Sequence, residues 1–363
     1  MKQSLIALSC TLMILLTASP VHGQMGTRFP SERKELSDPV TGARLVFLTS
    51  TPGRDRKIYP THNQWTSDGE WVIFRSERVG REAMAVNEKT GVMVQVTEGG
   101  YSGMLSVARK SMKLVIMRRP LNKGEKGGLE LVEIDLKTLF ADSEAGTLKS
   151  AGTYEKICGQ IPASLGAMAD NALDASEEWV WFRVSKNEAQ KHLAKGVKTE
   201  KDFGPRGMGA GPSGIAGMNL LNGEIKYVTS VPFQAGHIQA NPWMPGEIVF
   251  CWETGGKAPQ RTWIVHSDGT GLRPLYPEAE YEWVTHEAVI GKDEVAFAIL
   301  GHRPIPGAGD AGDYANHPGM EKEWGNCGTR EKPTGLGIVN IRTREMEIAG
   351  QLPAGSGLWH VHG

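Results

Sequence analysis

The chain has 363 residues, of which 40% are hydrophobic and 22% are charged, and it contains 45 glycines. This composition is typical of a globular protein with many turns, and it excludes a fibrous or an intrinsically disordered chain. Lys and Arg together number 40 and Asp and Glu 41, so overall charge gives no indication of a nucleic-acid partner. The length is compatible with two ordinary domains or with one large all-β domain.

The first 24 residues have the pattern of a secretory signal peptide. Lys2 supplies a positive charge, residues 5–18 form an apolar stretch, and residues 21–23 form the exit before Gln24. The apolar stretch is too short to predict a membrane anchor, so we expect no stable membrane insertion. The sequence therefore predicts an exported protein, periplasmic in a Gram-negative source, with a single domain over residues 25–363.

Removal of this segment would leave an odd number of cysteines, namely Cys158, Cys251 and Cys327. Three thiols cannot all pair within one chain. Two outcomes stay open from the sequence: a bridge between Cys158 and Cys327, or free thiols with Cys251 buried.

A two-part strand unit recurs along the chain. Residues 66–74 begin with a Ser-Asp-Gly turn, continue as an apolar strand, and are followed by a hairpin over residues 83–97. Further units begin at residues 110, 175, 245 and 291, and some of their hairpins carry Asn-Gly or Asp-Gly turns. These dipeptides are strong hairpin signals, and repeats of about 40–50 residues are typical of propeller blades. A β-sandwich would explain the strands but not the recurring turn. We therefore predict an all-β chain folded as a β-propeller.

The segments between and after the units also carry predictions. The units amount to about five blades, and a further fragment begins near Leu358. Residues 34–50 predict a strand pair that starts or closes the ring. The inserts at residues 186–211 and 302–332 are rich in Gly, Pro and charge, which predicts loops, with one short helix over residues 187–197. Loops on a rigid scaffold often form its binding face.

Four histidines stand at repeated positions. His237 and His286 occupy the same phase of successive blades, and His360 and His362 flank Val361 at the end of the chain. Equivalent positions of successive blades converge on one face, so these imidazoles are expected to meet there. In an extended segment, residues i and i+2 point to one side, so His360 and His362 can reach one metal ion. Imidazoles suit Mn, Fe, Ni or Zn. A turn-capping role for His237 and a chance grouping are the alternatives.

Polar residues before the first unit form a second candidate group. Basic and amide side chains there could grip a carboxylated, hydroxyl-rich ligand, and an ordinary solvated loop is the alternative. The group consists of Arg54, Arg56, Lys57, Tyr59, His62, Asn63 and Gln64. Arg206, in a glycine-rich loop, is a further candidate. The common hydrolase and zinc motifs, such as Gly-x-Ser-x-Gly and His-Glu-x-x-His, are absent from the sequence.

Taken together, these motifs resemble oligogalacturonide lyase of polysaccharide lyase family 22, a seven-bladed β-propeller. The resemblance rests on residues 38–45 (DPVTGARL), 65–69 (WTSDG), 236–237, 250–253 (FCWE), 263–264, 268–269, 285–287 (THE) and 360–362 (HVH). It implies β-elimination on galacturonides, with a divalent metal, typically Mn²⁺, binding the carboxylate of an acidic oligosaccharide. By resemblance His237 would take the C5 proton, and His286, His360 and His362 would hold the metal. Seven blades would mean that the C-terminal blade is truncated in this chain.

Two positions differ from the family pattern. Gly357 stands where the family has a metal-binding Gln, and residues 213–216 stand where it has a catalytic Arg. Arg206 or Arg183 could replace that arginine. The alternative functions are a lyase for another acidic polysaccharide, of ulvan or rhamnogalacturonan type, and a non-catalytic periplasmic propeller of TolB type. The sequence does not indicate an oligomeric state.

Overall fold

A computed structural model gives the fold of the chain. It describes residues 23–52, 55–121, 128–201, 208–254, 258–278, 284–299, 335–351, 358 and 360–362. Residues 1–22 of the predicted signal segment, and Cys327, lie outside the described residues. Cys158 and Cys251 are free thiols, and Cys251 is fully buried. Among the described residues, no helix is long and apolar enough to cross a membrane.

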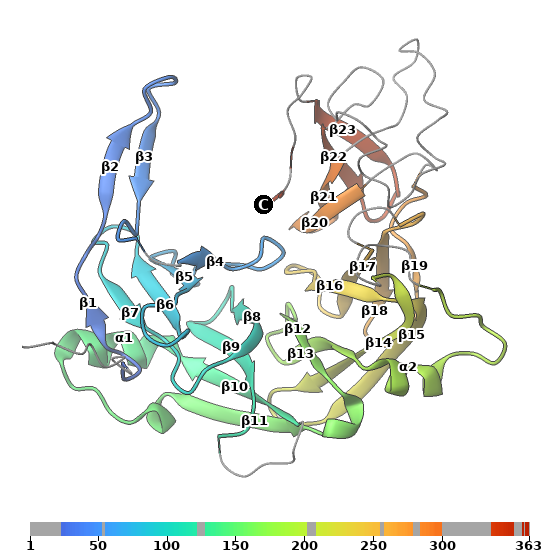
Figure 1. Cartoon of the computed structure of the whole chain (residues 1–363), viewed down its shortest axis with the longest axis horizontal. Helices are drawn as coiled ribbons and strands as arrows, with labels where there is room; N and C mark the ends of the chain where they lie inside the picture. Colours follow the sequence, from blue (N-terminus) through green and yellow to red (C-terminus); the bar gives the residue numbers. More distant parts are fainter. Residues whose placement is uncertain are drawn as a thin grey trace, which may run out of the picture.

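Five antiparallel sheets follow one another along the chain (Figure 1). The first has the order β1-β7-β6-β5-β4, with β1 (Arg28–Phe29), β4 (Arg56–Lys57), β5 (Trp71–Arg75), β6 (Ala83–Asn87) and β7 (Met93–Gln95). The second has the order β11-β10-β9-β8, with β8 (Ser102–Val107), β9 (Lys113–Arg118), β10 (Leu129–Asp135) and β11 (Glu155–Ile161). The third has the order β12-β13-β14-β15, with β12 (Met168–Leu173), β13 (Trp179–Val184), β14 (Ala210–Asn219) and β15 (Ile225–Phe233).

The last two sheets complete an arc around a common centre. The fourth runs β16-β17-β18-β19, with β16 (Ala235–Ala240), β17 (Glu247–Trp252), β18 (Thr262–His266) and β19 (Arg273–Pro274). The fifth runs β20-β21-β22-β23, with β20 (Val284–Gly291), β21 (Glu294–Ile299), β22 (Gly335–Asn340) and β23 (Met346–Gln351). In Figure 1 the strands β4, β8, β12, β16 and β20 lie nearest the centre, so they are the inner strands of five blades.

The β-propeller predicted from the sequence is confirmed, but the expected seven blades are not. The described residues form five blades, which is the number of strand units in the sequence. The seven-blade expectation came from the family resemblance rather than from the repeats. The strand pair predicted within residues 34–50 is present as the hairpin of β2 (Lys34–Ser37) and β3 (Arg44–Phe47). It forms a two-stranded sheet of its own, so the prediction that this pair starts or closes the ring was wrong.

Three blades use the same side-chain chemistry in a hairpin turn. The side-chain oxygens of Asn87, Asn219 and Asn340 each accept hydrogen bonds from the backbone N–H groups two and three residues further on. Such Asx turns replace the backbone bonds that a strand loses where it reverses. The turn then closes through a left-handed residue, Gly91 at φ 72° in the first blade and Arg344 at φ 64° in the last. The recurring turns seen in the sequence therefore have a common physical cause.

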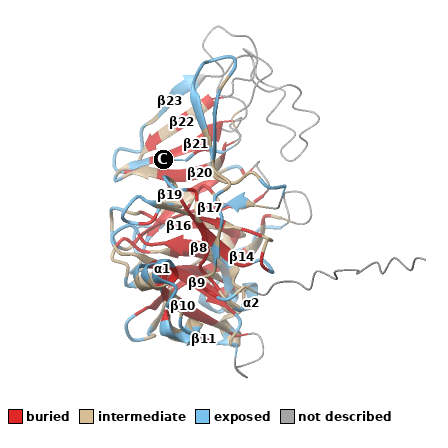
Figure 2. Ribbon diagram, turned by 90° about the vertical axis from the view of Figure 1, so that its left-hand side faces the viewer, coloured by how far each residue is buried: buried red, intermediate tan, exposed pale blue. Residues whose placement is uncertain are grey.

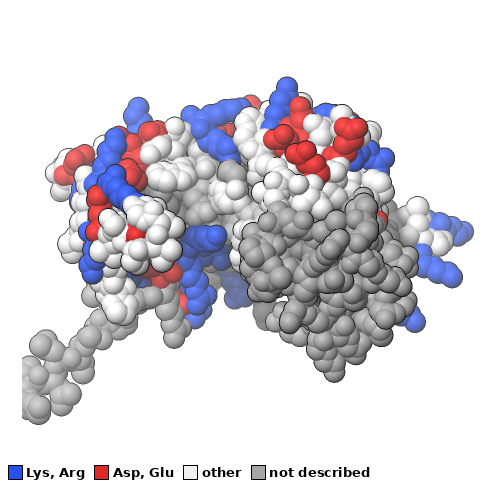
Figure 3. All heavy atoms as spheres, turned by 90° about the horizontal axis from the view of Figure 1, so that it is seen from above, with Lys and Arg blue, Asp and Glu red and all other residues white. Residues whose placement is uncertain are grey.

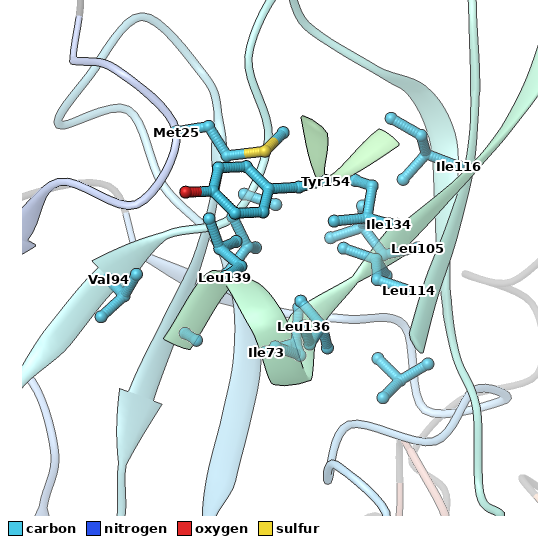
Figure 4. Close-up of a cluster of buried hydrophobic side chains, with 14 of the residues drawn as sticks. Met25, Ile73, Val94, Leu105, Leu114, Ile116, Ile134, Leu136, Leu139 and Tyr154 are labelled. Atoms are coloured by element: carbon cyan, nitrogen blue, oxygen red, sulfur yellow. The ribbon is translucent and has the colours of Figure 1, made fainter. Parts of the chain in front are cut away.

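Apolar side chains fill the spaces between neighbouring blades. Figure 4 shows the cluster between the first two blades, where Ile73 and Val94 face Leu105, Ile116 and other buried residues. Comparable clusters join the later blades in turn. Figure 2 shows the buried residues along the middle of the strands and the exposed residues at the turns. Basic and acidic side chains are intermixed among the described residues on the face shown in Figure 3, in keeping with the near-zero net charge.

Two short helices interrupt the strands. The helix α2 (Lys186–His192) confirms the short helix predicted in the first insert, and Ser185 caps it by accepting from the N–H of Glu188. The helix α1 (Leu136–Ala145) was not predicted. Its first turn is capped by Asp135, which accepts from the N–H of Thr138. Two single turns of 3-10 helix, Ala151–Thr153 and Ala163–Leu165, complete the structure.

Candidate active site

The inner strands carry a β-bulge at a repeated position. The register of β8, β16 and β20 against the adjacent strand shifts there. The first bulged residue is left-handed in each case: Gly103 at φ 72°, His237 at φ 49° and His286 at φ 53°. A left-handed backbone costs a residue other than glycine about 1–3 kcal/mol, and such residues cluster at functional sites. His237 and His286 therefore occupy equivalent, strained positions on successive blades.

Tyr59 lies among three of the predicted site histidines. Its ring centroid is 5.0 Å from that of His237, 6.4 Å from that of His286 and 5.5 Å from that of His360. The rings of His286 and His360 are closer still, with centroids 4.3 Å apart in an edge-to-face arrangement. Residues from the first blade, the fourth, the fifth and the chain end thus meet at one place. This is the convergence that the repeat phase predicts.

The end of the chain lies on the fifth blade through Val361. Val361 is buried against Ala288 and Ala296, whereas the flanking His360 and His362 are exposed. This alternation agrees with the extended conformation expected for the segment. His360 reaches Tyr59, and His362 lines a pocket of about 60 Å³ together with His62. The two terminal imidazoles therefore face away from the apolar contact.

Four ionisable side chains, called the charge ring below, form a closed ring beside the imidazole cluster. His237 Nδ1 lies 2.9 Å from Glu287 Oε1, and Arg261 Nε lies 2.9 Å from Glu287 Oε2. Arg261 Nη2 lies 3.7 Å from Glu253 Oε2, which lies 3.2 Å from His237 Nε2. Basic and acidic side chains alternate around the ring. Arg261 and Glu287 are buried, and the side chain of Glu253 is 14% exposed.

Close packing of the fourth and fifth blades builds this charge ring. A Cβ atom placed on Gly236 would lie 2.9 Å from the Cβ of Glu253, so only glycine leaves room for Glu253 beside His237. Gln239, two residues beyond His237, bridges the blades. Its amide donates to the backbone oxygen of Glu287 and accepts from the N–H of Val289. The bulges on β16 and β20 are thereby held in register.

The charge ring sets the protonation of its members. Burial opposes a charge on His237, but the adjacent Glu287 carboxylate outweighs it and raises the pKa of the imidazole. Burial likewise opposes a charge on Glu287, yet Arg261 and His237 hold the pKa of this carboxyl far below its usual range. Burial raises the pKa of the Cys251 thiol well above its usual value. Because the ionised Glu287 can only accept, the hydrogen bond between them is assigned with His237 Nδ1 as the donor.

The pKa of His286 is shifted in the opposite direction from that of His237. Burial, and then the neighbouring His360, lower the pKa of His286 to about 4. Its ring is neutral near pH 7, which is the form that binds a metal. An adjoining pair of imidazoles is a donor set that suits a borderline divalent metal, so His286 and His360 fit the predicted metal. Within the described part of the chain, however, three ligand atoms come within 4.8 Å of one another only in the group His237, Cys251 and Glu253. In their described positions the predicted ligands His286, His360 and His362 all stand outside this group.

The remaining predicted residues lie in different surroundings. Arg56 is exposed on β4, and Gln64 is half-buried, its backbone oxygen accepting from Ile73. His62 is buried, with Nδ1 2.7 Å from the hydroxyl of Thr61 and Nε2 2.6 Å from the backbone oxygen of residue 171. Both ring nitrogens of His62 are engaged by the protein, which favours a structural role over the predicted substrate contact.

Of the two arginine candidates, Arg183 lies among the described residues. Arg206, Arg54 and Gly357 lie outside the described residues. Arg183 donates from Nη1 to the backbone oxygen of Ala235, two residues before His237. It therefore supports the strand that carries His237.

The sequence did not predict Arg261, Glu253 or the ring that joins them. Glu253 lies two residues beyond Cys251, a spacing that puts both side chains on one side of an extended strand. That spacing was a usable signal. Arg261 offers none, because it precedes β18 and meets Glu287 only through the packing of two blades.

Two solved structures resemble the chain over most of its length. An oligogalacturonate lyase in complex with manganese has a TM-score of 0.63 and 17% identity, covering 92% of this chain and 76% of that chain. The oligogalacturonate lyase from Vibrio parahaemolyticus has a TM-score of 0.63 and 16% identity, covering 91% and 75%. No protein-family model and no curated protein sequence matches the chain. At these identities the likeness shows a shared β-propeller fold.

Proposed function

We propose that the chain is a metal-assisted lyase that cleaves oligogalacturonides by β-elimination. The observation that carries the proposal is the meeting of His237, His286 and His360 around the ring of Tyr59. The resemblance to two oligogalacturonate lyases, one of them a manganese complex, supports the substrate class and the metal. A propeller that acted only as a scaffold would have no use for two histidines held in strained conformations.

The reaction breaks the C5–H bond of a uronate, forms a C4=C5 double bond and expels the C4 oxygen. Loss of the C5 proton leaves negative charge that spreads into the adjacent carboxylate. A divalent metal, Mn²⁺ by analogy with the neighbour, would when bound neutralise that carboxylate and favour this loss. His286, His360 and His362 are the residues proposed to hold it.

His237 and Glu253 supply the proton transfers. In the proposed cycle the proton between His237 Nε2 and Glu253 moves to the carboxylate when substrate enters, which leaves Nε2 free to accept the C5 proton. Glu253 then gives its proton to the departing C4 oxygen. The product state is His237 protonated beside an ionised Glu253, which is the state from which the proposed cycle began. One proton is taken and one is returned in each turnover, so the cycle closes.

Groups from the first blade would bind the sugar. Tyr59 offers an aromatic face, and burial raises the pKa of its hydroxyl, which therefore remains a hydrogen-bond donor. Arg56 and Lys57 lie exposed on β4, just before Tyr59. Basic groups at this position suit a chain of carboxylates.

The test is an assay for the unsaturated uronide product, which absorbs in the ultraviolet. The full chain is incubated with oligogalacturonide, with ulvan-type and rhamnogalacturonan-type uronides, and with a neutral oligosaccharide, each with and without Mn²⁺. Metal-dependent product from oligogalacturonide supports the proposal. Product from another uronide alone would reject oligogalacturonide as the substrate and assign that uronide instead. Absence of product from every uronide, with metal bound to the protein, rejects a lyase.

A further inference from the structure

The trio of His237, Cys251 and Glu253 has the chemistry and spacing of a metal site. Glu253 Oε2 lies 3.2 Å from His237 Nε2 and 3.8 Å from Cys251 Sγ. A tetrahedral centre with bonds of ~2.0–2.3 Å separates its ligand atoms by roughly 3.3–3.7 Å, and each of these two edges lies within about 0.1 Å of that range. Glu287 lies behind His237 at Nδ1, as the carboxylate partner of a metal-bound histidine usually does.

A buried cation already lies against this trio. Arg261 Nη2 is 3.3 Å from His237 Nδ1 and 3.7 Å from Glu253 Oε2, and the residue is 1% exposed. Like charges this close repel strongly where water is excluded. Hydrogen bonding accounts for only part of the guanidinium, because Nε donates to Glu287 whereas Nη1 is buried without a partner among the described residues. Its positive charge is the property that the site uses.

We propose that Arg261 is the resident cation of the His237, Cys251 and Glu253 group and excludes divalent metal from it. The group is thus a latent metal site. Metal is then directed to the neutral imidazoles of His286 and His360. This inference rests on the proposed function in one respect: exclusion of metal from the group leaves His237 Nε2 available for proton transfer. Arg261 is a positioning residue in this account, since it acts through its neighbours.

Removal of the charge should open the latent site. In Arg261→Gln the side chain stays polar, and the carboxylates of Glu253 and Glu287 lose their fixed counter-charge. A divalent ion can then supply it and bind the Cys251 thiolate. Arg261→Lys keeps the charge and should keep the metal out. Comparison of the two variants separates the effect of the positive charge from the effect of losing the arginine side chain.

The experiment uses Co²⁺ as the probe, because a cobalt–thiolate bond gives a charge-transfer band that carboxylate and imidazole ligands lack. We expect one additional cobalt per chain and the thiolate band in Arg261→Gln, and neither in the wild type nor in Arg261→Lys. The double variant Arg261→Gln/Cys251→Ser should lose the band. Arg118→Gln is the matched control, because Arg118 is also buried between two carboxylates, Glu130 and Glu155, and should show no band.

Two results would overturn the inference. One is a thiolate band in the wild type, which would mean that the trio takes metal with Arg261 in place. The other is a folded variant with an uncharged residue at position 261 that binds no additional cobalt. If Arg261→Gln does not fold, Arg261→Met is used for this measurement. Cobalt content and the band are read without substrate. A chain with no lyase activity can therefore still pass or fail this test.

Discussion

Glu287→Ala is expected to destabilise the fold strongly. Glu287 is fully buried, and its two oxygens lie 2.9 Å from His237 Nδ1 and 2.9 Å from Arg261 Nε. Removing one partner of a buried ion pair costs about 3–5 kcal/mol, because the other charge stays buried and unpaired. Arg261 would keep only Glu253, at 3.7 Å, as a counter-charge. We therefore expect a loss of about 3 kcal/mol in the free energy of unfolding, the lower end of that range.

A double-mutant cycle measured by urea unfolding tests this value. The cycle uses Glu287→Leu, Arg261→Met and the two together. Replacing both members of a buried pair by apolar groups of similar volume is often neutral, so the double variant should be more stable than Glu287→Leu alone. A Glu287→Ala cost below about 1 kcal/mol, or a double variant destabilised by the full sum of the singles, would refute the reasoning.

Three other predictions concern the metal and the first blade. His286→Ala should lower both metal content and turnover, measured by metal analysis and product formation, and unchanged metal content would remove His286 from the ligand set. Val361→Ser should loosen the chain end and weaken Mn²⁺ affinity in a titration, with little change in the unfolding free energy, because Val361 packs on one face of the fifth blade in a small cluster with Ala288 and Ala296. Hydrogen bonds from Arg78 hold the pKa of Glu32 far below its ordinary value of 4.5, so the stability that Glu32 gives is complete above that pH and lost as pH falls below it. Acid titration of unfolding should thus be shallower in Glu32→Gln, and equal slopes would contradict this.

The sequence predicted the architecture because its turns are local. The Asn-Gly and Asp-Gly turns and the alternating strands are determined by a few neighbouring residues. They can therefore be predicted without knowledge of the tertiary structure. The helix α1 was not predicted, although its N-cap residue Asp135 is a typical capping residue. The reason is that the strand β10 ends at Asp135 and leads directly into the helix. The number of blades followed the repeats in the chain rather than the family resemblance.

Some residues of the candidate site could likewise be predicted from local sequence, whereas others could not. His237 and His286 could be found because a repeated phase along the chain becomes a shared position in space. Arg261 and Glu253 could not be paired with His237, because their meeting depends on how β17, β18 and β20 pack. The absent Cβ of Gly236 leaves room for Glu253 within the fourth blade, and nothing in a single sequence distinguishes this glycine from one in a turn.

The most direct test of the account is the turnover of His237→Ala on the uronide that the wild type cleaves, with bound Mn²⁺ measured on the same sample. General acid–base catalysis contributes about 10²–10⁴-fold, so the account predicts a loss of at least 100-fold with metal content unchanged. Turnover at the wild-type rate would show that His237 does not accept the C5 proton.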